Sequence, residues 1–226
     1  MGCMIGVDVG GTFTDFSIFD TKTREISHFK NSSTPEDPSR AIISGILHLL
    51  TEKCINPEDV SYLAHGTTVA TNALIEKKGA RLGLITTKGF KDLMEIGWQR
   101  RPSLYDLHRP KPESLIPPGL KCEVEERILY DGTVQTELNE ESVRKAVRYL
   151  KDQNVETIAV CTLFSFINPD HEQRIKEIVK EEYPEVYIST SSELVPEFRE
   201  YSRMSTTVLN AYLGPVMKKY VHKFEK

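Results

Sequence analysis

Apolar and polar residues alternate along the first part of the chain. Residues 4–9 read MIGVDV, in which every second side chain is apolar, and this period of two is typical of a half-buried strand. Alternation resumes over residues 12–20. The Gly10-Gly11 pair between the two stretches predicts a two-residue hairpin turn, because glycine adopts the positive φ that such turns need.

Strand-like and helix-like patterns then follow one another. A third strand is expected, and after it an amphipathic helix that Asp37 caps, with Pro38 at its first position. A short apolar strand, a helix ended by Gly79 and a buried strand come next. In chain order, these are the strand at 25–31, the helix at 37–50, the strand at 60–64, the helix at 69–78 and the strand at 82–86. The order β-β-β-α-β-α-β predicts an α/β layered fold.

Residues 97–121 interrupt this order with five prolines, and no regular element fits them. A segment of this length without secondary structure is usually functional or disordered, and Trp98, Tyr105 and Leu107 favour an ordered loop. Further strands are expected at 123–129, 155–164 and 187–190. Helices are expected to begin at Asn139, at Asn168 and at residue 200. The prediction is a lobe at 1–96, an irregular segment at 97–121 and a second α/β unit at 122–226.

Composition and charge exclude several classes of protein. The 29 basic and 33 acidic residues give a net charge of −4 without a basic block, so no nucleic-acid surface is expected. No apolar run approaches the roughly 18 residues of a membrane span, and the N-terminus lacks the basic region of a signal peptide. The four cysteines form no C-x-x-C pair, which argues against a zinc site or a disulfide framework. We therefore expect a cytoplasmic protein with reduced thiols, no nucleic-acid partner and no membrane partner.

The first hairpin carries polar residues that a turn does not explain, namely Asp8, Thr12, Thr14 and Asp15. Phosphate binds where backbone N–H groups and hydroxyls converge, and a tight glycine turn offers them without side chains in the way. Thr12 and Thr14 are expected on one strand face, where both hydroxyls can reach the same anion. Asp8 would repel bare phosphate, but it suits a Mg²⁺ ion held through water. A plain hairpin with incidental polar residues is the alternative reading.

Two familiar nucleotide-binding motifs are absent from the chain. It contains no G-x-x-x-x-G-K-[ST] sequence and no G-x-G-x-x-G sequence that opens a helix. A nucleotide site in this chain would therefore be of the hairpin kind.

A second polar group, His65-Gly66-Thr67-Thr68, joins an expected strand to an expected helix. Backbone donors at the start of a helix favour an anion or a developing oxyanion. Asn72 lies one turn into this helix and is expected to face the same region. The structural alternative is that Thr67 or Thr68 caps the helix and that His65 ends the strand.

Four longer stretches follow a recognisable pattern. They are GVDVGGTFTD (6–15), HGTTVATNALIEKKGARLGLITTKGFKDLMEIG (65–97), RPSLYDL (101–107) and SSELVPEFREYSRMSTTVLNAYLGP (191–215). The first resembles the first phosphate motif of the actin, Hsp70 and sugar-kinase superfamily. Together they resemble the N-terminal region of the hydantoinase A and 5-oxoprolinase family, and their number and order argue against coincidence. The resemblance implies a ribonuclease-H-like ATPase lobe.

The resemblance also implies an ATP-dependent enzyme acting on a cyclic amide such as 5-oxoproline or a hydantoin. In such an enzyme ATP phosphorylates the amide oxygen and water then attacks the activated carbon. Carried over by position, the implied residues are Gly10, Gly11, Thr12, Thr14 and Asp15 for ATP, Asp8 for Mg²⁺, His65, Thr67 and Thr68 for catalysis, and Gly66, Asn72 and Arg101 for the substrate. For Arg101, a solvated loop charge is an equal alternative. Trp98 stands where the family commonly has a basic residue, and an indole cannot replace a guanidinium in binding an anionic group.

Other functions stay open at this point. They are an ATP-dependent ketone carboxylase subunit of the same family, a sugar or acyl kinase, and a non-catalytic nucleotide-binding subunit. The resemblance further implies a C-terminal ATPase lobe, which this chain lacks, and a partner subunit or domain of the hydantoinase B type. Gly10-Gly11 is the only adjacent glycine pair, so no second phosphate hairpin is found. By itself the chain is therefore not expected to turn over ATP.

Overall fold

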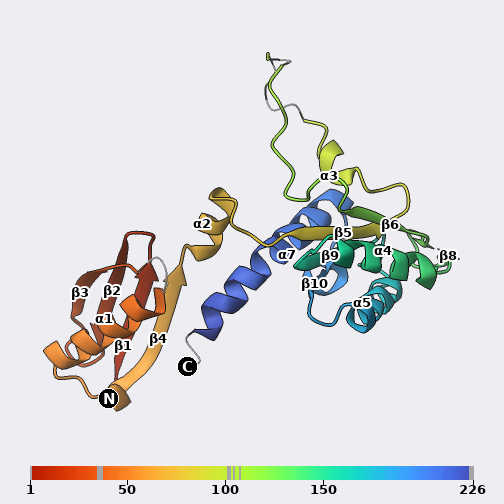
Figure 1. The fold of residues 1–226 in the computed structure, drawn as a ribbon. Coiled ribbons are helices and arrows are strands. Elements are labelled where there is room, and N and C mark those ends of the chain that lie inside the picture. The colour runs from red at the N-terminus through yellow and green to blue at the C-terminus, as the bar shows by residue number, and fades with distance from the viewer. Residues whose placement is uncertain (1, 35–37, 101–102, 104, 107, 224–226) are drawn as a thin grey trace. The chain divides into compact units, whose positions relative to one another are not determined.

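The computed structural model describes residues 2–34, 38–100, 103, 105–106 and 108–223. The chain divides into two compact units, Met1–Lys78 with Val216–Lys226, and Gly79–Pro215. Each unit contains its own four-stranded sheet (Figure 1). No described helix combines the length and the apolar character that crossing a bilayer requires.

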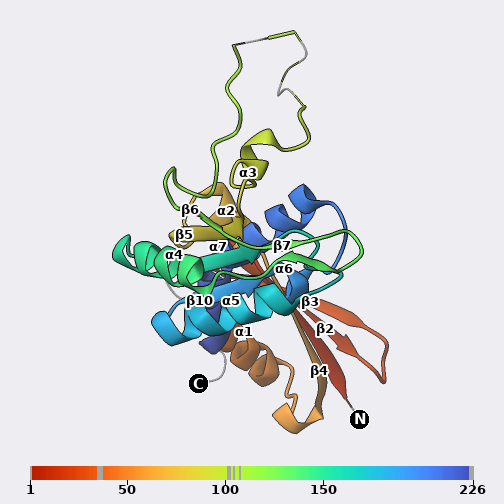
Figure 2. The ribbon, with the colours of Figure 1, turned by 90° about the vertical axis from the view of Figure 1, so that its right-hand side faces the viewer.

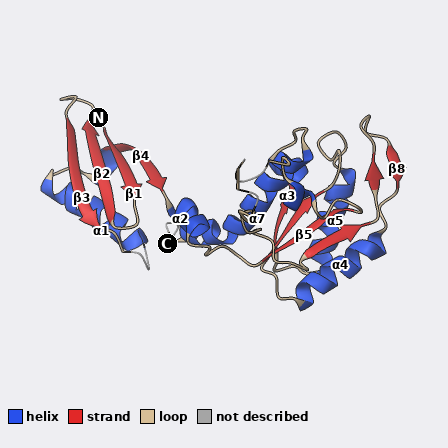
Figure 3. Cartoon of the chain, turned by 90° about the horizontal axis from the view of Figure 1, so that it is seen from above, coloured by secondary structure: helices blue, strands red, loops and turns tan. Residues whose placement is uncertain are grey.

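The first unit is a mixed sheet with a long helix packed against it (Figure 3). Its elements are β1 (Cys3–Val9), β2 (Phe13–Asp20), β3 (Ile26–Ser32), α1 (Pro38–Glu52), a 3₁₀ turn (Pro57–Asp59), β4 (Val60–Thr67) and α2 (Val69–Ile75). The strand order is β3-β2-β1-β4. Strands β1, β2 and β3 are antiparallel to their neighbours, and β4 is parallel to β1. The expected strands and helices of this unit are thus found, but α2 ends at Ile75 and not at Gly79, and Asp37, the expected cap of α1, lies outside the described residues.

One face of this sheet forms the core of the first unit. Alternate residues of β1 from Cys3 to Val9 are buried there, as are Phe16 and Ile18 of β2. Gly45 allows α1 to approach the sheet, because a Cβ at this position would lie 2.1 Å from the Phe16 ring. The side chains between the buried ones, such as Asp8, lie on the opposite, exposed face.

The hairpin between β1 and β2 differs from the predicted two-residue turn. Three residues, Gly10 to Thr12, separate the strands, and the N–H of Gly10 donates to the carbonyl of Phe13 at 3.0 Å. The described glycines with positive φ are Gly89, Gly97, Gly119 and Gly132, so neither hairpin glycine is needed for that conformation. Gly10 is instead required by close approach, because a Cβ there would lie 3.0 Å from the Phe13 carbonyl oxygen.

The second unit is built around a parallel sheet with the order β10-β9-β5-β6 (Figure 2). Its elements are β5 (Leu82–Thr87), α3 (Leu93–Ile96), β6 (Lys121–Val124), β7 (Arg127–Ile128), β8 (Val134–Thr136), α4 (Glu140–Asp152), β9 (Thr157–Cys161), α5 (Asp170–Glu182), β10 (Tyr187–Thr190), α6 (Ser191–Leu194) and α7 (Glu200–His222), whose last residues belong to the first unit. Asn139 caps α4 by accepting a hydrogen bond from the N–H of Ser142, as predicted. The described residues between α3 and β6 contain no helix or strand.

The predicted boundary at residue 96 differs from the division seen in the structure. Strand β5 was expected to end the first lobe, but it pairs with β6 on one side and β9 on the other. All six of its residues are buried, as in a strand whose sheet is covered on both faces. The first unit therefore ends at Lys78. The mixed α/β class is confirmed, whereas a ribonuclease-H-like order stays a prediction.

The expected strand at 123–129 is broken into β6 and β7 by a buried carboxylate. Glu126 is only 4% exposed and accepts a hydrogen bond from the hydroxyl of Thr87. Its second oxygen lies 2.8 Å from Nδ1 of His171, which is also buried. A buried carboxylate needs such partners, so residues 125–126 leave the ladder to place it.

Candidate functional site

The candidate site lies where β1 and β4 end, at one edge of the first sheet (Figure 1). In the parallel pair, Asp8 is aligned with Gly66 and Val9 with Thr67. The loop after β1 and the junction between β4 and α2 therefore emerge side by side. This register brings together the two sequence stretches that were predicted to carry the chemistry.

Gly66 makes room for the carboxylate of Asp8. A Cβ at Gly66 would lie 3.3 Å from Oδ1 of Asp8, closer than most side-chain contacts. Asp8 is exposed, and within the described residues no hydrogen bond or ion pair engages its carboxylate. A cation can therefore reach both oxygens.

Thr68 and Asn72 fasten α2 to the end of β1. The hydroxyl and the N–H of Thr68 both donate to the carbonyl of Val9, each at 3.3 Å. The Asn72 amide donates to the Thr68 hydroxyl at 3.3 Å. A Cβ on Gly11 would lie 3.7 Å from the Asn72 nitrogen, so this amide also borders the glycine loop.

The start of α2 is capped by the hydroxyl of Thr67. Its Oγ1 accepts a hydrogen bond from the N–H of Val69 at 3.2 Å, whereas Thr68, at the N-cap position, makes no side-chain cap bond. The alternative stated above, in which a threonine caps this helix, thus holds for Thr67. Thr68 contributes through the fastening to Val9 instead.

His65 lies on the other face of β4 from the Asp8 carboxylate. It is aligned with Val7, and side chains alternate between faces along a strand. Its Nε2 forms a hydrogen bond with the hydroxyl of Tyr220, and the two rings stack with centroids 5.7 Å apart. Burial lowers the pKa of His65, and the charge of Asp8 acts in the opposite direction. The structure therefore pairs His65 with Tyr220 and does not bring its ring to the Asp8 face.

Tyr220 is a site residue that the sequence reasoning missed. It is buried in the first unit, and this burial raises its pKa, while a hydrogen bond with Thr67 lowers it. It contacts His65 across 155 residues of sequence, and no local motif marks such a contact.

Thr14 does not lie where a phosphate could reach it. It is fully buried, and its hydroxyl shares a 2.9 Å hydrogen bond with the hydroxyl of Ser33, which itself donates to the carbonyl of Gly10 at 2.8 Å. Thr12 lies in the exposed loop, outside β2. The expectation that both hydroxyls share one face is therefore wrong, and Thr14 stabilises the hairpin from inside.

The remaining predicted residues are less informative. Asp15 is exposed and forms a 3.0 Å ion pair with Lys30. Arg101 falls outside the described residues, as does Leu107 of the expected ordered loop. Within the described part of the chain, no three His, Cys, Asp or Glu side chains are grouped to hold a metal ion.

The arrangement suits a nucleotide held with a hydrated cation. Mg²⁺ keeps several waters and needs one or two carboxylates besides the phosphates, and Asp8 offers one carboxylate. The exposed residues Gly11 and Thr12 offer backbone N–H groups beside it, whereas the N–H of Gly10 is already bonded to the Phe13 carbonyl. The residues present therefore fit a Mg–nucleotide complex.

Comparisons with known proteins show which family this chain resembles. Residues 4–183 match the family described as hydantoinase/oxoprolinase N-terminal region. The chain is 37% identical to the caprolactamase subunit alpha of Pseudomonas jessenii, over 98% of this chain and 32% of that protein. It is 38% identical to the acetophenone carboxylase gamma subunit of Aromatoleum aromaticum, over 95% of this chain and 31% of that one.

Structural similarity leads to the same relatives. The crystal structure of the ATP-dependent caprolactamase from Pseudomonas jessenii superposes with a TM-score of 0.88, covering 98% of this chain and 33% of that chain at 37% identity. The chain thus spans about a third of the length of the relatives that it matches. From the family match and these identities we conclude that the chain belongs to the hydantoinase/oxoprolinase family and corresponds to its N-terminal region.

Proposed function

We propose that this chain supplies the phosphate-binding edge of an ATP-dependent enzyme that opens a cyclic amide. The observation that carries the proposal is the alignment of Asp8 with Gly66, which leaves an exposed carboxylate beside the loop of Gly10 to Thr12. A carboxylate at such a loop would repel bare phosphate, so its presence there favours a bound Mg²⁺ ion between the two.

The residues of this edge then have separate tasks. The backbone N–H groups of Gly11 and Thr12 and the hydroxyl of Thr12 bind phosphate, Gly10 forms the turn through its bond to the Phe13 carbonyl, and Asp8 binds the hydrated Mg²⁺. Bound ATP would supply the phosphoryl group that activates an amide oxygen. Thr68 and Asn72 hold the start of α2 against β1, so that their polar atoms stay beside the loop.

His65, Thr67 and Gly66 act differently in this proposal. Gly66 provides space for the Asp8 carboxylate. Thr67 caps α2, and His65 bonds to Tyr220 on the other face of the strand. We therefore assign these three residues to the geometry of the edge, and the contact with the reacting carbonyl to Thr68 and Asn72.

The relatives support the reaction class. Hydrolytic opening of an unstrained lactam is unfavourable, and coupling it to ATP hydrolysis supplies the driving force. An amidase of this kind therefore needs a nucleotide-binding site. One relative is named caprolactamase subunit alpha, and the crystal structure that superposes on this chain is that of an ATP-dependent caprolactamase. We propose a cyclic amide substrate, the ATPase lobe expected from the family resemblance and a hydantoinase B-type partner for this chain as well.

A ketone carboxylase is the second candidate. The 38% identity to the acetophenone carboxylase gamma subunit favours it, because that relative is as similar as the caprolactamase subunit. The same phosphoryl chemistry would then activate a ketone as its enol phosphate.

The test is steady-state ADP release by the assembled enzyme, meaning this chain together with the regions that its relatives carry beyond the matched third. A panel of lactams, hydantoins, ketones with bicarbonate, and sugars is assayed with Mg²⁺ and ATP. Lactam-dependent ADP release with a ring-opened product supports the first proposal, whereas ketone-dependent release with a carboxylated product supports the second. A stable phosphorylated sugar would contradict both.

A further inference from the structure

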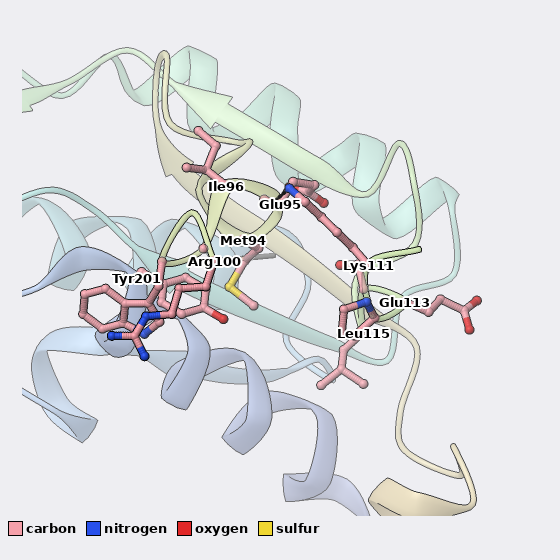
Figure 4. A pocket seen from close by; sticks show the side chains of 12 residues that line it. Met94, Glu95, Ile96, Arg100, Lys111, Glu113, Leu115 and Tyr201 are labelled. Atoms are coloured by element: carbon pink, nitrogen blue, oxygen red, sulfur yellow. Dashed lines mark hydrogen bonds between the residues drawn. The ribbon is translucent and has the colours of Figure 1, made fainter. Parts of the chain in front are cut away.

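In the pocket beside α3, two of the charged side chains bond to the chain itself (Figure 4). The pocket has a volume of about 450 Å³ and is lined by α3, the segment at 111–115 and the start of α7. Lys111 donates to the carbonyl of Glu95 at 2.8 Å, and the Glu95 carboxylate pairs with Lys121. The pocket therefore points to no particular ligand, whereas one face of the first sheet points to a partner.

On the face of the first sheet opposite α1, four large apolar or aromatic side chains form a row across all four strands. Met4 is aligned with Phe19 of β2 and with Tyr62 of β4, and Phe19 is aligned with Ile26 of β3. Directly aligned residues share a face, so these four side chains, the apolar row, lie next to one another. Ile26 and Tyr62, at the two ends of the row, are 61% and 56% exposed.

The other rows of the same face differ in character. The row after it carries small or neutral side chains, namely Gly6, Ser17, His28 and Ala64. Charges appear in the third row, with Asp8, Asp15 and Lys30. A sheet face that meets water normally carries polar side chains outward, as the third row does. The apolar row departs from this rule and therefore marks a surface that is covered by a partner.

Tyr62 places one end of the apolar row at an open edge of the sheet. Among the described residues β4 pairs with β1 alone, and its sequence VSYLAHGT contains no Asp, Glu, Lys or Arg. Exposed edge strands normally carry charges that prevent further pairing. Leu63, on the opposite face from Tyr62, is 54% exposed as well. The uncovered surface thus continues around β4, which suits folded polypeptide better than a small molecule.

The spacing of the apolar row suits a helix. Neighbouring strands lie about 4.8 Å apart, and one turn of an α-helix rises about 5.4 Å. A helix lying across the strands can therefore set one apolar side chain against each residue of the row, over about three turns. Gly6 leaves room for the body of the helix, because a Cβ there would have only the Ser17 carbonyl oxygen nearby, at 3.9 Å.

We propose that an amphipathic helix covers the apolar row, and that it comes from the regions that the relatives carry beyond the matched third. The caprolactamase chain contains the same fold with a TM-score of 0.88, and this chain covers only 33% of it. A helix within the same assembly has a high effective concentration, which favours it over a second copy of this chain. Its apolar side would face the row and its polar side would face water.

Photocrosslinking identifies what covers the row. Tyr62 is replaced by p-benzoyl-phenylalanine in the assembled enzyme, which is irradiated without nucleotide or substrate, and the crosslinked peptides are identified by mass spectrometry. We expect a crosslink to a helical segment beyond the matched third. A crosslink to the second unit or to a second copy of this chain, or no crosslink, would overturn the inference.

Thiol labelling measures the cover at the other end of the row. Ile26→Cys is labelled with a maleimide in this chain alone and in the assembled enzyme, and we expect labelling to be at least about tenfold slower in the assembled enzyme. Ile43→Cys is the matched control, because Ile43 is 52% exposed on α1, which packs against the other face, and its rate should change less than about twofold.

Equal rates for Ile26→Cys in the two proteins would contradict the proposed cover. Equal slowing of Ile26→Cys and Ile43→Cys would also contradict it, because the protection would not be specific to the row. Neither measurement uses ATP or a lactam, so its result is independent of the proposed function.

Discussion

Asp8 and Asp15 lie directly opposite each other in the antiparallel pair of β1 and β2, and both are exposed on the same face. Like charges at opposed positions of a sheet destabilise it. Lys30 relieves Asp15 through a 3.0 Å ion pair, whereas Asp8 has no described ion-pair partner. A position that disfavours folding is expected where a charge is needed for binding.

Replacing Asp8 should therefore separate stability from activity. In Asp8→Asn the opposed charges are removed, and the free energy of unfolding is expected to rise by about 0.5 kcal/mol. The Mg²⁺-dependent turnover of ATP by the assembled enzyme is expected to be lost, because the carboxylate that binds the cation is gone. Urea unfolding and ADP release measure the two effects. Glu58→Gln, which neutralises an exposed carboxylate in the 3₁₀ turn of the same unit, is the control and should keep turnover.

Thr14 and Thr12 are predicted to respond in opposite ways. Thr14→Val removes the buried hydrogen bond to Ser33 and should lower the free energy of unfolding by about 1 kcal/mol. Thr12→Val changes an exposed loop residue, so its stability should stay within about 0.5 kcal/mol while nucleotide binding weakens. Loss of nucleotide affinity in Thr14→Val at unchanged stability would contradict the structural role given to Thr14.

Substitutions at Thr67 and Thr68 are predicted to affect different properties, stability for Thr67 and turnover for Thr68. Thr67→Val leaves the N–H of Val69 without its side-chain acceptor and should cost about 1 kcal/mol of stability, the usual loss for a helix cap. Thr68→Val is expected to lower kcat more than it raises KM for ATP, if the hydroxyl serves the reacting centre. A normal kcat in Thr68→Val would assign Thr68 to the fastening of α2 alone.

The periodicity of the sequence was sufficient for most elements, because alternate burial along β1 and β2 follows directly from alternate apolar residues. It could not tell which sheet β5 joins. A strand with only buried residues has no polar face to orient it, and its partners β6 and β9 lie far along the chain.

The candidate site was predictable only in part. The two stretches that meet at the edge of the first sheet were identified, and the parallel register of β1 and β4 explains why they meet. Spacing suggested that Thr12 and Thr14 share a face, but the loop extends by one residue and so leaves Thr12 outside the strand. The contact of His65 with Tyr220 joins residues 155 positions apart, beyond the reach of any local pattern.

The lowered pKa of His65 predicts a pH dependence of stability. Burial shifts this pKa below its ordinary value of 6.5, so between the two values the unfolded chain binds the proton more readily. The contribution is fully present above about pH 6.5 and is lost as the pH falls towards the pKa of the folded state. Urea unfolding at several pH values measures it. His65→Gln should lose this pH dependence, and Tyr220→Ala should reduce it by exposing the imidazole; an unchanged slope in His65→Gln would assign it to another group.

The most direct measurement of the central claim is ADP release by the assembled enzyme with Mg²⁺, ATP and a series of lactams, for the unmodified chain and for Asp8→Asn. We predict that a lactam stimulates ADP release, that ring-opened product forms with it, and that Asp8→Asn abolishes both while its stability rises slightly. Undiminished lactam-dependent ADP release by a folded Asp8→Asn protein would contradict the account.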